Sequence, residues 1–525
     1  MTFETDQHHT GVSQPFTMSE TTASRKKAGP IEWAGLAVLA LPTALLGLDM
    51  TLLYLALPAL AEDLRPSSTQ ALWIMDAYGF MIAGFLITMG TLGDRIGRRR
   101  LLMIGAIAFG AASVLAAFSP TANTLIAARA VLGVAGATLM PSTLALISNM
   151  FLQPSQRALA IGVWATMFAL GMALGPLVGG ILLSHFWWGS AFLVALPVVA
   201  IVLIAGPWLL PEYRAPVSGR FDLLSVALSL AAILPVVYFV KESAKTGLTP
   251  VPILVLMTGV VCGAIFVKRQ RILSSPLLDV RLFRNGTFSA ALGILLFGLV
   301  GVGGAMLLVT QYLQLVLDLP PVIAGLWMGP PAFMMIVAGI GAPLLARNIR
   351  PAFVMAGSLA LSAVGYLLLA MLPWMPGLTP VTIGYALVYL GLGTIAALGT
   401  DLVVGATPPE KAGSASAMSE TVQELGIALG VALFGSLTTL VYREAIFDRI
   451  SKNLPQDVSA AFADSLWAAS TIATPVAKDL IVDAKASFVS GMSASAAVAA
   501  VGVALLSVLC AWTLGQAPTL SDSRK

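Results

Sequence analysis

Fourteen long apolar stretches dominate the chain and constrain its fold more than any other feature. Most approach or exceed the roughly 20 residues that a helix needs to cross a bilayer. Short segments with glycine, proline or charged residues separate most of them. They predict an all-α integral membrane protein with 14 transmembrane helices. The stretches lie near residues 34–58, 70–92, 101–118, 122–147, 158–182, 187–210, 222–240, 250–267, 287–315, 322–346, 352–373, 379–405, 413–441 and 492–514.

The composition leads to the same environment. The 525 residues are 58% hydrophobic and 10% charged, whereas soluble domains are about 45–50% apolar and about 25% charged. A bilayer tolerates such a surface because lipid, not water, surrounds the protein. Cys262 and Cys510 lie far apart in apolar stretches and indicate no disulfide framework. We expect the lipid bilayer, and not nucleic acid, as the macromolecular environment.

The distribution of basic residues predicts that both termini are cytoplasmic. With the N-terminus inside, 20 of the 29 Lys and Arg residues fall in cytoplasmic segments, 8 in outer segments and one, Arg129, within a span. Such an excess on the cytoplasmic side is typical of membrane proteins. Lys241, which follows the stretch 222–240, is assigned to an outer segment. Residues 1–30 lack the apolar core of a signal peptide, so we expect a disordered cytoplasmic tail.

Two similar loops indicate an internal repeat. The loop 90–100 and a fainter echo at 341–347 occupy equivalent positions in two six-helix units. Transporters often contain such parallel repeats, with the substrate site between them. The predicted organisation is the tail at 1–30, an N-terminal six-helix bundle at 31–211, a two-helix insert at 212–270 and a C-terminal six-helix bundle at 271–525. Residues 443–490 form a long extracellular loop, either a cap over the outer mouth or a tolerated insertion.

Six ionisable residues lie inside predicted spans, where an ionised side chain costs about 2.5–3.5 kcal/mol. Such residues usually face the bundle interior and mark a pathway for substrate or protons. Five acids and one base predict an acidic interior that attracts cations. A carboxylate there binds a proton or a cation but not both well, which is the physical basis of antiport. The residues are Asp49, Asp76, Arg129, Asp401, Glu420 and Glu424.

We interpret Asp49, Asp76, Glu420 and Glu424 as the carboxylates that bind protons or substrate. Glu420 and Glu424 are four residues apart and share a helix face, although a polar stripe facing water would show the same spacing. Asp401 is a weaker candidate because it lies near the predicted cytoplasmic end of its span. Asp222, at the end of another span, is interpreted as a surface charge.

Arg129 is the single base that we place inside a span. Its guanidinium stays protonated, so it needs an acidic or carbonyl partner. A structural ion pair and a coupling role, in which Arg129 senses the protonation of a carboxylate, are both open. Trp73 and Tyr78 flank Asp76, and they are candidate cavity residues because aromatic faces attract alkylammonium groups.

Two groups of small and charged residues are candidate conformational motifs. One helix face carries three glycines at four-residue spacing beside a helix-bending proline. We expect this face next to the other half of the protein, where a rocking motion would pivot, with ordinary tight packing as the alternative. In the loop 90–100, an aspartate is expected to cap the following helix. The residues are Gly171, Gly175, Pro176 and Gly179 in the first group, and Gly90, Asp94, Arg95, Gly97 and Arg98 in the second.

Together these motifs resemble the major facilitator superfamily, specifically its fourteen-span drug:proton antiporters. The loop 90–100 resembles the family's cytoplasmic signature, and the segment 125–137, with Arg129 and Gly133, resembles the motif associated with proton coupling. The segments 171–180 and 48–58 resemble motifs of antiporters and of the fourteen-span group. Pumps for quaternary ammonium compounds share segments similar to 72–78, 278–283, the acidic stretch 413–441 and the long loop before the last span.

The resemblance covers nearly the whole chain after the tail. It implies a major facilitator fold and proton-coupled export of lipophilic cations, such as quaternary ammonium antiseptics and dyes, by alternating access. We expect no cofactor or metal, a proton gradient as the driving force, a monomer, and a place in the bacterial inner membrane. Some of these pumps carry an aspartate linked to divalent cations where this chain has Met335. The difference argues against efficient transport of divalent antiseptics, unless Asp401 or Glu424 substitutes.

Two alternatives differ in substrate or in class. The same scaffold serves exporters of neutral or zwitterionic antibiotics or metabolites, which the acidic interior disfavours. A channel or a membrane-embedded enzyme is disfavoured further. The sequence shows no Cys/His metal cluster, no nucleophile with its base and no phosphate-binding loop, and His185 falls at a predicted outer loop. We therefore expect a secondary active transporter and not an enzyme.

Overall fold

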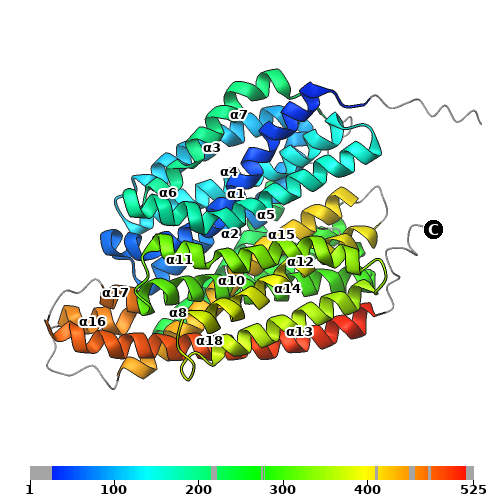
Figure 1. Cartoon of the computed structure of the whole chain (residues 1–525). Helices are drawn as coiled ribbons and strands as arrows, with labels where there is room; N and C mark the ends of the chain where they lie inside the picture. Colours follow the sequence, from blue (N-terminus) through cyan, green and yellow to red (C-terminus); the bar gives the residue numbers. More distant parts are fainter. Residues whose placement is uncertain are drawn as a thin grey trace, which may run out of the picture.

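The computed structural model describes residues 27–214, 222–273, 276, 278, 280–407, 412–447, 456–470 and 475–515. Within these ranges every regular element is a helix (Figure 1). The elements are α1 (Pro30–Leu64), α2 (Ser68–Ile96), α3 (Arg98–Ala117), α4 (Ala122–Met150), α5 (Pro154–His185), α6 (Ser190–Leu193), α7 (Ala195–Leu209), α8 (Leu223–Thr246), α9 (Pro250–Ile272), η1 (Val280–Arg284), α10 (Gly286–Gln311), η2 (Tyr312–Val316), α11 (Pro321–Trp327), α12 (Gly329–Leu345), α13 (Pro351–Ala370), α14 (Leu378–Gly405), α15 (Ala412–Phe447), α16 (Gln456–Asp464), α17 (Leu466–Ser470) and α18 (Pro475–Leu514).

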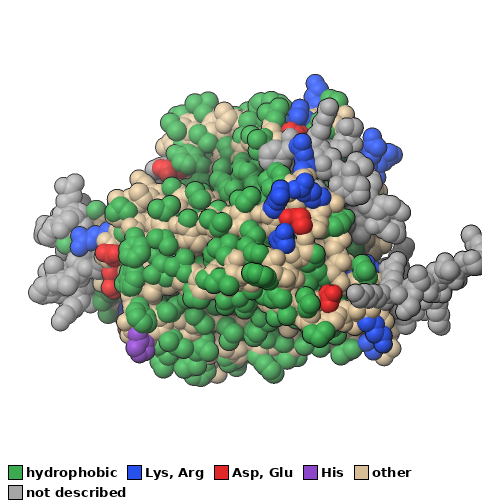
Figure 2. All heavy atoms as spheres, turned by 90° about the horizontal axis from the view of Figure 1, so that it is seen from above, with side chains coloured by type: hydrophobic (Ala, Val, Ile, Leu, Met, Phe, Trp, Pro, Cys, Tyr) green, Lys and Arg blue, Asp and Glu red, His purple; other side chains and the backbone are tan. Residues whose placement is uncertain are grey.

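Fourteen helical segments in the described residues are long and apolar enough to cross a membrane, which confirms the predicted number of spans. Three of these spans consist of two consecutive elements, namely α6 with α7, α10 with η2, and α11 with α12. Figure 2 shows a surface on which hydrophobic side chains dominate the middle and charged side chains gather toward the ends. This surface fits a protein whose sides face lipid.

The stretch 443–490, predicted as a long extracellular loop, is largely helical within the described residues. α15 continues to Phe447, α16 and α17 follow, and α18 begins at Pro475 instead of near residue 492. The 40 residues of α18 correspond to a length of about 60 Å, twice the roughly 30 Å of a hydrocarbon core. A hydropathy window finds the apolar part of such a helix and misses its polar extension. Residues 448–455 and 471–474 of this stretch, and residues 1–26 of the predicted tail, lie outside the described residues.

The spans pack as two groups that lie side by side, α1–α7 in blue to cyan-green and α10–α18 in green to red (Figure 1). Between them in sequence, α8 and α9 form a helical hairpin. α8 also packs against α2 and α15, so it touches both groups. Phe80 of α2, Val237 of α8 and Ala428 of α15 share one buried apolar cluster. α8 is therefore part of the seam between the halves.

The two groups meet closely near the end that carries α16 and α17. Gly180 of α5 faces Pro321 of α11, at 2.6 Å between a Cβ placed on Gly180 and the Pro321 carbonyl oxygen. On α2, Ser68 donates its N–H and its hydroxyl to the Asp464 carboxylate of α16, at 2.8 and 3.1 Å. We name this contact the Ser68–Asp464 clasp. It ties the N-terminal half to the helices that follow α15.

The three predicted glycines at 171, 175 and 179 pack on α1 of their own half, and not on the other half as expected. A Cβ on Gly171 would overlap the carbonyl oxygen of Ala44, and one on Gly175 would overlap the hydroxyl of Thr51. The neighbouring Pro176 and Gly180 do contact α11, through Gly325 and Pro321. The glycine face thus lets α1 and α5 approach closely, while the opposite side of α5 faces the other half.

We predict that Gly171→Ala lowers the thermal unfolding temperature by several degrees in differential scanning fluorimetry. The added methyl group must push backbone away from backbone, and overpacking of this kind costs about 1–3 kcal/mol. Gly162→Ala is the matched control on the same helix, because a Cβ there meets nothing within 4 Å. Equal unfolding temperatures for the two variants would contradict this packing.

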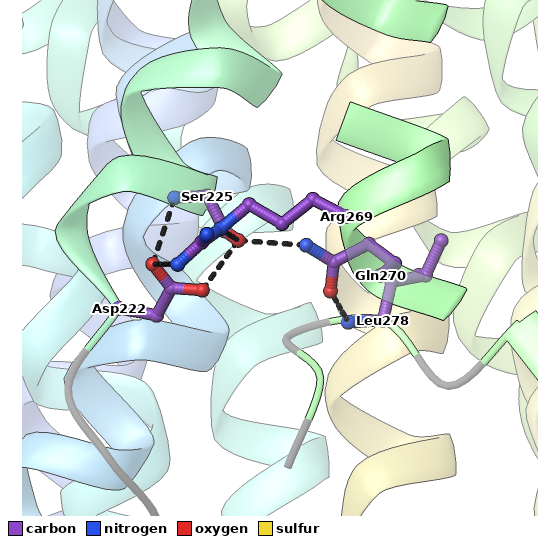
Figure 3. A network of polar contacts seen from close by, with 5 residues as sticks. All are labelled: Asp222, Ser225, Arg269, Gln270 and Leu278. Atoms are coloured by element: carbon purple, nitrogen blue, oxygen red, sulfur yellow. Dashed lines mark hydrogen bonds and ion pairs between the residues drawn. The ribbon is translucent and has the colours of Figure 1, made fainter. Parts of the chain in front are cut away.

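One polar network fixes the start of α8 (Figure 3). The Asp222 carboxylate accepts hydrogen bonds from the Ser225 N–H at 3.1 Å and from Arg269 Nη2 at 3.0 Å. Gln270 donates to the Ser225 hydroxyl and accepts from the Leu278 N–H. Asp222 is thus the N-cap of α8 and joins it to α9, which corrects its interpretation as a surface charge. Burial alone would raise its pKa, but hydrogen bonds from Ser225 and Arg269 hold the pKa of Asp222 below its usual value.

We predict that Asp222→Asn lowers the unfolding temperature at pH 7, because asparagine still caps a helix but loses the ion pair with Arg269. A carboxyl group whose pKa is lowered by folding stabilises the protein above its usual pKa, near 4. That contribution disappears as the pH falls through the lowered value. The difference between wild type and variant, measured by the same fluorimetry, should therefore shrink below about pH 4. A difference that stays constant with pH would contradict the role of the charge.

Candidate functional site

A cavity lies in the interior where α1, α2 and α4 of one half meet α15 of the other. Two carboxylates, one guanidinium and two tyrosines contribute to its wall, and the remaining lining is apolar. Helices far apart in sequence therefore build one site from both halves. Its lining residues are Met50, Tyr54, Met75, Asp76, Tyr78, Gly79, Arg129, Glu424, Ile427, Ala428 and Val431.

Arg129 of α4 is bound on several sides. Its Nη1 lies 2.8 Å from Asp49 Oδ2 on α1, and its Nε donates to the Ile74 carbonyl at 3.2 Å. Its guanidinium carbon lies 4.4 Å from the centroid of the Tyr78 ring. The Arg129 side chain is 2% exposed and that of Asp49 is 11% exposed. A buried charge needs a partner of this kind, so the Asp49 carboxylate is committed to Arg129 in this structure.

The structure contains a second buried base that was not predicted from the sequence. Lys241 of α8 places its Nζ 2.7 Å from Asp76 Oδ2, and the two side chains are 0% and 1% exposed. The same Nζ lies 4.1 Å from the centroid of the Trp73 ring. The prediction that Lys241 lies in an outer segment is therefore wrong. So is the prediction that Arg129 is the single base within the spans. The sequence contains a usable signal, since Ile233 and Val237 form an apolar face at four-residue spacing and Lys241 continues it.

Glu424 of α15 lines the cavity without a cationic partner among the described residues. It is 6% exposed, and its Oε2 receives no hydrogen bond within the described part of the chain. The hydroxyl of Tyr78 is likewise buried without a partner there. Glu420, one turn before Glu424, is half-buried and does not line the cavity. An acid and a hydroxyl with free hydrogen-bonding capacity thus face the same small space.

The other predicted residues lie outside this cavity. Asp401 of α14 is exposed, and Trp73 of α2 packs against the buried cluster that contains Val237 of α8 and Ala428 of α15. Met335 of α12 is buried against Gly393 of α14. Of the four carboxylates predicted to bind protons or substrate, Asp76 and Glu424 line the cavity and Asp49 reaches it through Arg129.

The residues of the loop 90–100 lie at the junction of α2 and α3, which is one end of the bundle. Gly90, Asp94 and Arg95 belong to α2, and Arg98 begins α3. The N-cap of α3 is Gly97 and not Asp94, whose side chain lies outside the described part of the structure. Gly97 has φ +113°, a region that favours glycine.

Glu212 is the partner of this junction and was not predicted from the sequence. Its Oε1 accepts the Arg99 N–H at 3.1 Å, and its Oε2 lies 3.9 Å from Nε of both Arg99 and Arg100. Glu212 lies just after α7, more than 100 residues from the arginines, so no local pattern identifies it. The contact joins the α2–α3 junction to the end of the N-terminal half.

The profile of the Major Facilitator Superfamily matches residues 39–431. The chain belongs to this superfamily. Chains of the superfamily are small-molecule transporters that cross a membrane several times, so this one is a secondary transporter and not an enzyme.

Named relatives match most of the chain. The chain is 41% identical over 488 residues to the multidrug efflux pump LfrA of Mycolicibacterium smegmatis, covering 92% of this chain and 96% of the pump. It is 35% identical over 463 residues to the methyl viologen resistance protein SmvA of Salmonella typhimurium, covering 86% and 92%. The multidrug resistance protein Stp of Mycobacterium tuberculosis is 30% identical over 413 residues, covering 78% and 76%.

A solved structure supports the fold. The inward-facing, unoccupied structure of a bacterial homologue of the human lysosomal transporter Spinster superposes with a TM-score of 0.68. The match covers 93% of this chain and 98% of that one at 16% identity. At this identity the likeness concerns the fold alone. The major facilitator fold predicted from the sequence is thereby confirmed.

In this superfamily member, charge pairing dominates the candidate site, and we predict that pairing also stabilises it. Arg129→Met leaves Asp49 buried without a partner, a change that typically costs 3–5 kcal/mol. We expect a clear fall in unfolding temperature by scanning fluorimetry. In Arg129→Met combined with Asp49→Asn, both buried charges are gone, and most of the lost stability should return. A double variant as unstable as the single one would show that the pair is not the relevant partner.

Proposed function

We propose that the chain exports lipophilic cations across the bacterial inner membrane in exchange for protons, by alternating access. The observation that carries the proposal is Glu424, a buried carboxylate that lines the cavity between the halves and has no cationic partner among the described residues. Relatives named as a multidrug efflux pump and as a methyl viologen resistance protein support export as the direction of transport.

The exchange follows from the cost of burying charge. An unpaired carboxylate in an apolar cavity is stable when it is protonated or when it binds a cation. Proton and substrate therefore compete for Glu424. The neighbouring rings of Tyr54 and Tyr78 add faces that attract organic cations. Protons entering from the outer side displace the cation, and a cation from the cytoplasm displaces the proton.

Movement of the halves gives the site access to each side in turn. α5 contacts α11 and α2 contacts α15 across the seam, and these contacts are the points about which the halves turn. In this proposal the α2–α3 junction and both termini are cytoplasmic, the α16–α17 end is external, and the monomer is the working unit.

The test is ethidium transport in proteoliposomes with an acidic lumen. We predict gradient-dependent ethidium uptake into the lumen by the wild type and a loss of at least about tenfold in Glu424→Gln, which keeps the size of the side chain but cannot exchange a proton. Asp401→Asn is the matched control, since it removes an exposed carboxylate outside the cavity.

Two results would overturn the proposal. The first is ethidium transport by the wild type that does not depend on the pH gradient. The second is Glu424→Gln transport equal to that of Asp401→Asn, with both proteins folded by gel filtration. Saturation of the rate with ethidium concentration separates a carrier from a pore.

A further inference from the structure

Lys241 reaches the cavity wall from behind. Asp76 lines the cavity and Lys241 does not, while Lys241 Nζ lies 2.7 Å from Asp76 Oδ2 and 4.1 Å from the Trp73 ring centroid. The carboxylate therefore lies between the cavity and the ammonium group. A positive charge is fixed beside the site without occupying any of its space.

The helix that carries this charge is firmly seated. Val237, one turn before Lys241, is buried with Phe80 of α2 and Ala428 of α15. Further along, a Cβ on Gly84 of α2 would lie 2.6 Å from Leu230 of α8. The far end of α8 is held by the Asp222 network. Withdrawing Lys241 would require separating α8 from both halves, so its charge is a permanent part of the site.

The pairing determines how many negative charges face a substrate. Two carboxylates line the cavity, Asp76 and Glu424. Lys241 neutralises the first, and Asp49 already neutralises Arg129. Glu424 is left as the lining acid without a cationic partner among the described residues. A cation with one charge is balanced by Glu424, while a second charge brought toward Asp76 meets the ammonium of Lys241.

We propose that Lys241 sets the charge of the transported cation, restricting the cavity to substrates with one positive charge. The inference rests on the proposed function, because it requires cationic substrates. Lys241 is a positioning residue for charge and does not touch the substrate. Without it, Asp76 and Glu424 together are complementary to a dication.

The test compares binding of ethidium, which has one positive charge, with binding of propidium, which has the same ring system and a second cationic group. Both are titrated into the purified full-length protein by fluorescence anisotropy. In Lys241→Gln, we expect the ratio of propidium affinity to ethidium affinity to rise by at least about tenfold, because one unit charge near the site is removed.

A second variant moves the ratio in the opposite direction. Asp76→Asn leaves Lys241 as an uncompensated charge beside the cavity, so propidium binding should fall more than ethidium binding. This variant also keeps the proposal testable if Lys241→Gln does not fold. Lys485→Gln is the control, because it removes a lysine of α18 that pairs with Asp318 and does not line the cavity. Its affinity ratio should equal that of the wild type.

A purely structural role for the pair predicts a different result. In that case Lys241→Gln and Asp76→Asn weaken both probes equally and lower the unfolding temperature, and the affinity ratio does not change. An unchanged ratio in folded protein overturns the inference while ethidium export by the wild type leaves the proposed function standing. A wild type that neither binds nor exports either probe counts against the proposed function itself.

Discussion

The cost of placing a charge in an apolar interior governs this molecule. An ionised group without a partner is expensive there, and the structure meets this cost by pairing across helices. Arg129 of α4 binds Asp49 of α1, and Lys241 of α8 binds Asp76 of α2. Each pair joins helices that are distant in sequence. The arrangement of α1, α2, α4 and α8 around the cavity is thus linked to where the charges find partners.

Glu424 departs from this rule, and the departure gives the site its chemical capacity. Satisfied pairs hold helices together but leave nothing for a ligand. A buried acid without a cationic partner among the described residues is the kind of group at which a proton and a cation can replace one another. In the proposed mechanism, the same interior therefore contains groups that stabilise the fold and one that is available for exchange. Lys241 pairs with Asp76, which leaves Glu424 as the lining acid without a cationic partner among the described residues.

Much of the fold could be predicted from the sequence, because hydropathy depends on local composition. The number of spans follows from apolar runs, and the glycine face of α5 follows from a four-residue period. The ends of helices were harder to predict. α8 continues past the apolar run to include Lys241, and α18 begins in a polar segment, since a helix stops where its backbone bonds stop and not where its side chains become polar. The partners of Asp76 and of the α2–α3 arginines could not be predicted either. Lys241 and Glu212 become their neighbours only through packing of helices that lie far apart in the chain.

The Ser68–Asp464 clasp bears on how fast a cycle of opening and closing can run. At the α16–α17 end, it joins α2 to α16 with two hydrogen bonds to one carboxylate, and hydrogen bonds to charged groups are worth about 1.5–3 kcal/mol each. A protein that opens this end must break both bonds in every cycle, even if partial exposure to water weakens them. In the proposed cycle, the Ser68–Asp464 clasp therefore adds to the free-energy barrier for opening this end. Turnover can therefore be tuned there in evolution, with the chemistry of the cavity untouched.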